Sequence, residues 1–391
     1  MTRFYLSCLL AFTAGHMVNY TVILYLQETV GSDLLSGIGF GLSFGSSLLF
    51  GWFAGVLCDR VAPHRVIQWA QTLFVVCLGL LWWIDGQATG DTRVVLVMFA
   101  ALFSGLGWSF VGPARLAALG QLADPTRLKP ATILFNVQVM LGFGLAPIVL
   151  AVQRHYGGWP WVFATGIVLF VASGLMLLGI RTKEAAASQQ SATRDLLDSF
   201  AFIARTPLLK QLLLAAVIAY AMTGPMQIML PKLAREVLGL SEIQRGIYLG
   251  LMALSLIIGG IGALLLGKYL HHGRAVFAAT VVASLAFASL SHWSHPVVSA
   301  GVLAGMGALG GMVISFVVAG IQAQVSDALR GRVMAVYAII SQVIPALSGV
   351  LAGYWVRHAG VTDALLGAGV GLACIAALGA AAMPQLRRMA Q

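Results

Sequence analysis

Long apolar runs alternate with short polar segments along the whole chain, and this pattern predicts its fold. About 20 consecutive apolar residues, wound as a helix, span the hydrocarbon core of a bilayer. The chain contains twelve runs of about this length, and each predicts one transmembrane helix. They lie at residues 4–26, 34–57, 66–84, 94–119, 131–152, 160–180, 209–230, 246–267, 275–291, 297–322, 333–356 and 362–382. The predicted fold class is an all-α membrane protein of twelve transmembrane helices.

The amino-acid composition excludes a water-soluble globular fold. Hydrophobic residues make up 59% of the chain and charged residues only 9%, whereas soluble domains carry about 25% charged residues. The net charge of +10 does not indicate nucleic-acid binding, because the basic residues are dispersed between apolar runs and do not form one polar face.

The basic residues instead predict the orientation in the membrane. If the chain crosses twelve times, Arg3 and Arg387 lie on the same side, and the connections on that side hold 17 of the 23 lysines and arginines. Cytoplasmic connections of membrane proteins are enriched in these residues. We therefore expect a multi-pass protein of the bacterial inner membrane with both termini in the cytoplasm.

The predicted helices fall into two halves of six. We expect an N-terminal bundle over 1–180, a cytoplasmic linker over 181–207 whose second part is amphipathic, and a C-terminal bundle over 208–391. One segment repeats between the halves: Gln121–Lys129 and Gln324–Arg332 share Q-x-x-D-x-x-R-x-(K/R), each after the fourth helix of its half. Repeated halves are typical of transporters whose binding site lies between them.

Three polar motifs carry a family resemblance. The connection after the second run, Gly55–Arg65, reads G-V-L-C-D-R-V-A-P-H-R. The other two are Gly112–Arg115 together with Leu128–Ala131, and Arg330–Val333. Through these motifs the chain resembles the major facilitator superfamily over essentially its full length, and within it the branch of the enterobactin exporter and multidrug-efflux proteins. The resemblance implies secondary transport by alternating access.

Two positions depart from the pattern of proton-coupled exporters in that superfamily. The arginine that many of them carry in helix 4, four residues before a glycine, is Ala101 here. The helix-5 signature of drug–proton antiporters is only partly present in Gly142–Ala151. Protons remain a candidate coupling ion. The resemblance gives this candidate little support, because both of these positions differ.

No enzyme motif is present in the sequence. It contains no HExxH, GxSxG, P-loop or DxD segment, and its four cysteines have no CxxC spacing. We expect no catalytic residues, no cofactor and no metal site. The expected partners are a small-molecule substrate and the lipid bilayer, and we expect a monomer.

One face of the first helix holds the polar groups most suited to a substrate cavity. Phe12, His16 and Tyr20 recur at helical spacing, with Asn19 beside them. All 13 acidic residues lie in connections or at helix ends, so His16 is the titratable side chain in mid-helix. We hypothesise that this face lines the central cavity and that His16 titrates during transport. The alternative is a neutral histidine that is hydrogen-bonded to a neighbouring helix.

Further polar, aromatic and methionine side chains complete a cavity that we expect to be large, mostly apolar and uncharged. The Gly224–Pro225 pair is expected to break the seventh helix and free backbone carbonyls. The predicted substrate-binding residues are His16, Asn19, Tyr20, Trp108, Asn136, Gln138, Tyr220, Met222, Met226 and Gln227.

The charged connections on the cytoplasmic side predict a gate. Asp59 has no counterpart in the second half, where Gly267 and Lys268 replace Asp59 and Arg60, so we expect Asp59 to face the start of the eleventh helix and latch the halves. The alternative is a solvated charge that only orients its loop. The predicted gating residues are Asp59, Arg60, Arg65, Arg115, Asp327, Arg330 and Arg332.

The leading hypothesis is export of a hydrophobic or amphipathic small molecule such as a drug, a siderophore or a similar metabolite. One alternative is a lysophospholipid flippase. Another, of a different class, is a membrane receptor or enzyme without transport activity, which would need a catalytic cluster or a large domain outside the membrane.

Overall fold

The computed structural model describes residues 1–124, 127–183, 200–325 and 327–389. Side chains are not described for 52–56, 58–59, 129, 327–328 and 330–331. The chain divides into two compact units: unit 1 holds Met1–Ser188 and Leu240–Gly250, and unit 2 holds Gln189–Gly239 and Leu251–Gln391.

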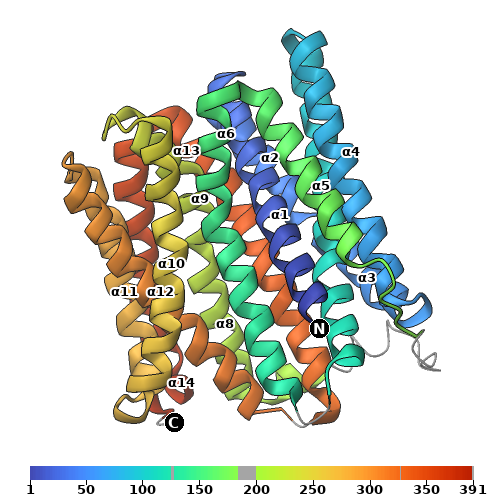
Figure 1. The fold of residues 1–391 in the computed structure, drawn as a ribbon. Helices are drawn as coiled ribbons and strands as arrows, with labels where there is room; N and C mark the ends of the chain where they lie inside the picture. The colour runs from blue at the N-terminus through green and yellow to red at the C-terminus, as the bar shows by residue number, and fades with distance from the viewer. Residues whose placement is uncertain (125–126, 184–199, 326, 390–391) are drawn as a thin grey trace. The chain divides into compact units, whose positions relative to one another are not determined.

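Unit 1 is a bundle of helices (Figure 1). Helix α1 contributes residues from Phe4 to Leu26 to its hydrophobic core. Helix α1 packs on α6 and α2, α4 packs on α5 and α6, and α2 and α3 pack on α5. From Ala11 to Gln27, every residue of α1 except Leu24 is buried, because neighbouring helices surround this part of α1. The helices are α1 (Thr2–Glu28), α2 (Asp33–Gly45), α3 (Ser47–Arg60), α4 (Pro63–Gln87), α5 (Gly90–Leu122), α6 (Leu128–Met176) and the start of α10 (Glu242–Leu266).

Unit 2 has its own core, in which α13 packs on α8, α9 and α11. Residues 200–205 are helical and precede α8. The helices are α8 (Pro207–Ala221), α9 (Thr223–Glu236), the rest of α10, α11 (His272–Ser289), α12 (Pro296–Ala323), α13 (Asp327–Ala382) and α14 (Pro384–Arg388), with short 3₁₀ turns η2 (Gly267–Tyr269) and η3 (Leu290–His292).

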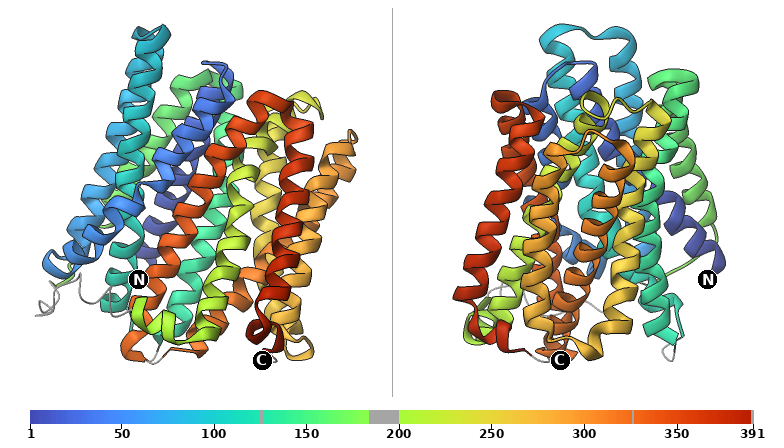
Figure 2. Two further views of the ribbon diagram at one scale, coloured as in Figure 1. Left: turned by 180° about the vertical axis from the view of Figure 1, so that it is seen from behind. Right: turned by 90° about the vertical axis from the view of Figure 1, so that its left-hand side faces the viewer.

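Helices α6 and α13 each contain two of the predicted membrane spans. Among the described residues, ten helices are long and apolar enough to cross a membrane, and these two have 47 and 51 residues in the qualifying stretch. Each folds back at a glycine with positive φ: Gly158 at 66° in α6 and Gly360 at 80° in α13. Figure 2 shows the two long arms of α13. The prediction of a twelve-helix membrane protein is confirmed. Each half of the sequence contains one such pair of helices joined at a glycine, α6 in the first half and α13 in the second.

Two predicted spans are each divided into two helices. The second span becomes α2 and α3 around Ser46, and the seventh becomes α8 and α9 around Met222. The helix is interrupted close to the expected Gly224–Pro225 pair, since α8 ends at Ala221 and α9 begins at Thr223. A side chain at Gly224 would collide with the backbone at Pro345 and Gly349, so glycine is needed where α9 crosses α13.

Several helix starts follow directly from the sequence. The hydroxyl of Ser32 accepts a hydrogen bond from the backbone N–H of Leu35 at 3.3 Å and caps α2. Pro63, Pro207 and Pro296 occupy the first turns of α4, α8 and α12, where proline's missing N–H has no cost.

Candidate functional site

His16 lies at the centre of an aromatic cluster inside unit 1. Its ring centroid is 4.8 Å from that of Trp108 on α5 and 5.0 Å from that of Phe143 on α6. Tyr20, one turn further along α1, stacks on Phe143 at 6.1 Å. The expected face of α1 is therefore an aromatic surface, formed with two neighbouring helices.

Trp108 is held in this cluster by a hydrogen bond and by a close approach to α1. Its indole Nε1 donates to the side-chain oxygen of Asn19 at 3.1 Å. A Cβ at Gly15 would lie 2.9 Å from the indole carbon Cζ2, so the ring fits only against a glycine. The structure thus brings together His16, Asn19, Tyr20 and Trp108, which the sequence predicted as separate members of one site.

Two phenylalanines of α6 belong to the cluster and were missed by the sequence analysis. Phe143 packs on His16 and Tyr20, and Phe135 packs edge-on against Phe12 at 5.4 Å. Gly142 brings their helix into backbone contact with α1, because a Cβ there would lie 2.8 Å from the backbone of Phe12. A phenylalanine within an apolar run carries no sequence signal for a site.

Several polar atoms of the cluster are buried without a hydrogen-bond partner among the described residues. They are both ring nitrogens of His16, the Asn19 nitrogen Nδ2 and the Gln138 oxygen Oε1. Within the described part of the structure, neither ring nitrogen of His16 is hydrogen-bonded to a neighbouring helix. Buried polar atoms without partners are costly, and at a functional site they are available to a ligand.

Gln138 and Asn136 lie on different faces of α6. The Gln138 side chain is buried and donates a hydrogen bond to the backbone oxygen of Tyr5 at 2.9 Å. The Asn136 side chain is exposed. Of the two predicted amides, the structure brings Gln138 to the contact between α6 and α1 and does not bring Asn136 there.

Unit 2 holds a second group of predicted residues. The hydroxyl groups of Tyr220 on α8 and Tyr337 on α13 are 2.8 Å apart and hydrogen-bonded. Met226 and Gln227 are buried on α9, and the Gln227 oxygen Oε1 has no partner among the described residues. Met222 is half-buried at the break between α8 and α9. Tyr337 was missed, because one tyrosine in an apolar run gives no hint of its pairing.

Arg115, predicted as a gating residue, lies in the interior of unit 1 with 0% of its surface exposed. Its guanidinium donates to the hydroxyls of Ser7 and Ser173 at 3.2 and 3.1 Å, and to the Cys8 sulfur at 3.1 Å. It also lies 5.7 Å from the ring centroid of Phe12. A buried arginine held by neutral groups is costly in a membrane protein, which marks this position as important.

The other predicted gating residues lie at helix ends. Arg60 ends α3 and Arg65 lies in the first turn of α4, and both side chains are exposed. Arg332 is half-buried in α13. The side chains of the remaining three, Asp59, Asp327 and Arg330, lie outside the described part of the structure.

The comparisons with known proteins agree with this architecture. A family model described as Major Facilitator Superfamily matches residues 4–349. No curated protein matches this chain in sequence.

Solved transporter structures share the fold at low sequence identity. A POT family transporter in complex with a thioalcohol-conjugated peptide superposes with a TM-score of 0.78 at 12% identity, covering 98% of this chain and 96% of that one. A peptide transporter POT in complex with sulfate gives 0.74 at 16% identity, covering 100% and 95%. A bacterial homolog of the human lysosomal transporter Spinster, inward-facing and unoccupied, gives 0.71 at 14% identity, covering 99% and 97%.

Proposed function

This chain belongs to the major facilitator superfamily, and from that membership we propose that it exports a hydrophobic or amphipathic small molecule, such as a drug, a siderophore or a similar metabolite. Secondary transporters of this superfamily work by alternating access, and so does this protein. The substrate class and the export direction are our proposal. The direction rests on the resemblance of its motifs to the efflux branch.

The observation that carries the proposal is the aromatic cluster around His16. Indole, phenol, phenyl and imidazole rings from α1, α5 and α6 meet there, together with uncharged polar atoms that have no described partner. Aromatic walls bind apolar and ring-containing ligands through large contact areas. The unpaired His16 and Asn19 nitrogens supply a small number of directional hydrogen bonds.

The residues of unit 2 support a ligand that varies in shape. Methionine side chains are flexible and polarizable; Met222 lies at the break between α8 and α9, and Met226 lies one turn further along, in α9. The hydroxyl pair of Tyr220 and Tyr337 adds polar groups without charge. A sugar would require more amides and carboxylates, and a small cation would require an acid in the middle of the membrane.

Gating at the cytoplasmic side is also part of our proposal. We place the protein in the bacterial inner membrane with both termini in the cytoplasm, and we assign Asp59 to a latch with the start of α13 near Arg330 and Arg332. Protons are the candidate coupling ion, with His16 as the carrier.

A ligand panel scored by thermal shift in detergent tests the substrate class, because a specific ligand stabilises the folded protein according to its occupancy. We expect hydrophobic or amphipathic aromatic compounds to raise the melting temperature. Trp108→Ala is expected to weaken their binding by about tenfold or more. Trp69→Ala is the matched control, since Trp69 is 52% exposed on α4 and lies outside the aromatic cluster around His16.

Two outcomes would overturn the proposal: stabilisation by sugars or small cations alone, or an unchanged ligand response in Trp108→Ala. The flippase alternative is separated by comparing transport of a fluorescent lysolipid and a soluble dye in oriented vesicles. Transport of the lysolipid alone would replace our assignment with that alternative.

A further inference from the structure

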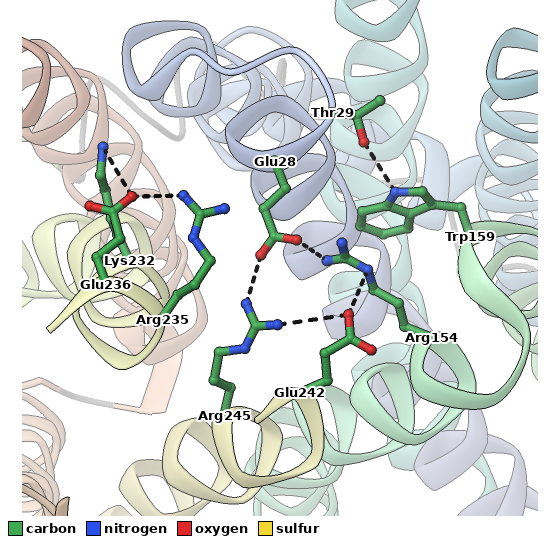
Figure 3. Close-up of polar contacts among 9 residues, drawn as sticks. All are labelled: Glu28, Thr29, Arg154, Trp159, Lys232, Arg235, Glu236, Glu242 and Arg245. Carbon is green, nitrogen blue, oxygen red and sulfur yellow. Dashed lines mark hydrogen bonds and ion pairs between the residues drawn. The ribbon is translucent and has the colours of Figure 1, made fainter. Parts of the chain in front are cut away.

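Four charged side chains form a closed ring in unit 1, at the end of α1 opposite Met1 (Figure 3). Glu28, the last residue of α1, pairs with Arg154 of α6 and with Arg245 of α10, the latter at 2.9 Å. Glu242, the first residue of α10, contacts Arg154 at 3.1 Å and Arg245 at 3.7 Å. Each acid thus contacts both arginines, and the four charges sum to zero.

The ring is largely shielded from solvent and is ordered by its neighbours. Its side chains are only 11–26% exposed. The Arg154 guanidinium also lies 4.3 Å from the ring centroid of Trp159. Trp159 in turn donates a hydrogen bond from Nε1 to the Thr29 hydroxyl at 3.1 Å. Because the pairs are shielded and held in a network, they are worth more than isolated surface ion pairs.

Beside the ring, α10 lies in direct backbone contact with α6. A Cβ at Gly246 would lie 2.6 Å from the Pro147 carbonyl oxygen, and one at Gly250 would lie 2.7 Å from the Gly144 oxygen. Glycines four residues apart lie on one face of a helix and allow this approach within a membrane. The start of α10 is therefore held against α6 by packing and against α1 and α6 by charge.

This fastening joins the two halves of the sequence. Residues 240–250 follow the linker in the chain but belong to unit 1, whereas α10 from residue 251 onward belongs to unit 2. Alternating access requires the halves of the sequence to move, so the contacts of α10 with α1 and α6 are contacts that such motion changes.

We propose that Glu28, Arg154, Glu242 and Arg245 form an electrostatic clamp that keeps this end of the transporter closed and breaks each time it opens. The proposal depends on alternating access, which follows from the family, and not on the substrate class. When the clamp opens, water hydrates the separated charges and offsets part of the lost attraction, so the clamp is reversible. This end is opposite the one to which the sequence assigned a latch.

Glu28 pairs with both arginines, so removing its charge tests the clamp. Glu28→Gln leaves two arginines with one acid, so the closed arrangement retains an uncompensated positive charge. The double variant Glu28→Gln/Arg245→Gln retains the neutral pair of Arg154 and Glu242. The clamp should therefore be weakest in Glu28→Gln and partly restored in the double variant.

The experiment measures how fast a buried cysteine becomes accessible from this end. Ile23, fully buried on α1 five residues before Glu28, is replaced with cysteine in a background lacking the four native cysteines. A membrane-impermeant maleimide is added to either side of oriented proteoliposomes without substrate. Glu236→Gln is the matched control, because the Glu236 pairs with Lys232 and Arg235 lie within α9.

A second reporter distinguishes opening from unfolding. A companion variant retains Cys77, which is fully buried in unit 1, as its single cysteine. We expect Glu28→Gln to speed labelling at residue 23 by about tenfold from one side, the double variant to lie between it and the parent, and Cys77 to stay unlabelled. Unchanged labelling at residue 23, labelling equal to that of Glu236→Gln, or simultaneous labelling of Cys77 would each overturn the clamp.

Discussion

The indole Nε1 of Trp108 donates a hydrogen bond to the side-chain oxygen of Asn19 at 3.1 Å. An indole N–H can only donate, so this contact fixes which way the Asn19 amide points. The oxygen must face Trp108, and the amide nitrogen is left without a partner among the described residues. One bond between α1 and α5 therefore positions the aromatic wall and directs a free donor of the site.

Replacing Asn19 with leucine should destabilise the protein by about 1–3 kcal/mol, because the buried Trp108 N–H loses its acceptor. Thermal unfolding in detergent measures this loss. In the double variant Asn19→Leu/Trp108→Phe the unpaired donor is gone as well, so the two losses should not add. Strictly additive losses would show that the bond does not couple the two side chains.

Replacing His16 with glutamine should abolish the stimulation of transport by a pH gradient. Glutamine still donates and accepts hydrogen bonds but cannot carry a proton, and the acidic residues of the sequence lie in predicted connections or at helix ends. Transport in proteoliposomes with and without an imposed gradient measures the effect. If the gradient dependence is unchanged, His16 is a binding residue and not the carrier.

Replacing Arg115 with lysine should destabilise unit 1 even though the charge is kept. The guanidinium bridges Ser7, Ser173 and Cys8, and a lysine cannot reproduce this planar set of donors. We expect a loss of about 1–3 kcal/mol in thermal unfolding. Arg127→Lys is the control, because Arg127 is exposed. Equal stability in both variants would show that the Arg115 hydrogen bonds contribute little.

Adding a methyl group to α10 should destabilise the protein where α10 contacts α6, and should not where no atom is close to the glycine. Gly246→Ala places a Cβ 2.6 Å from the Pro147 oxygen, so α10 has to shift, at a cost of about 1–3 kcal/mol. Gly262→Ala meets nothing within 4 Å and should be neutral or stabilising, because alanine favours helix. Melting temperatures of the two variants provide the comparison, and a similar change in both would contradict the close contact.

Asp59→Asn should weaken the state in which the cytoplasmic side is closed. A negative charge at this position can pair with Arg330 or Arg332 and with the start of a helix, and an amide retains little of that attraction. Cysteine labelling from the cytoplasmic side should therefore speed up. Unaltered labelling together with unaltered transport would favour a charge that only orients its loop.

The membrane-spanning helices were predictable from the sequence because bilayer thickness sets the length of each apolar run. The motif resemblance placed the chain in its superfamily, and the helical spacing of Phe12, His16 and Tyr20 indicated the face of α1 that contacts the aromatic rings of α5 and α6. Each of α6 and α13 consists of two helical arms that meet at a glycine with non-helical backbone, Gly158 or Gly360, and these arms correspond to the separate spans that the sequence predicted.

The parts of the site that were missed share a physical reason. Phe135, Phe143 and Tyr337 lie in runs where most of the neighbouring residues are also hydrophobic, so nothing in the sequence separates them from residues that only pack. Glu28 and Glu242 lie at helix ends, where charges are ordinarily solvated. Only the fold brings Glu28 and Glu242 together with Arg154 of α6 and Arg245 of α10.

The most direct test of the proposed function is transport itself. Proteoliposomes containing the purified protein are loaded with the compound that gives the largest thermal shift. They should transport this compound faster than loaded liposomes that contain no protein. Trp108→Ala should reduce the transport rate about tenfold, and Trp69→Ala should leave it unchanged. Transport of the compound at equal rates by the parent protein and Trp108→Ala would contradict a substrate site at the aromatic cluster.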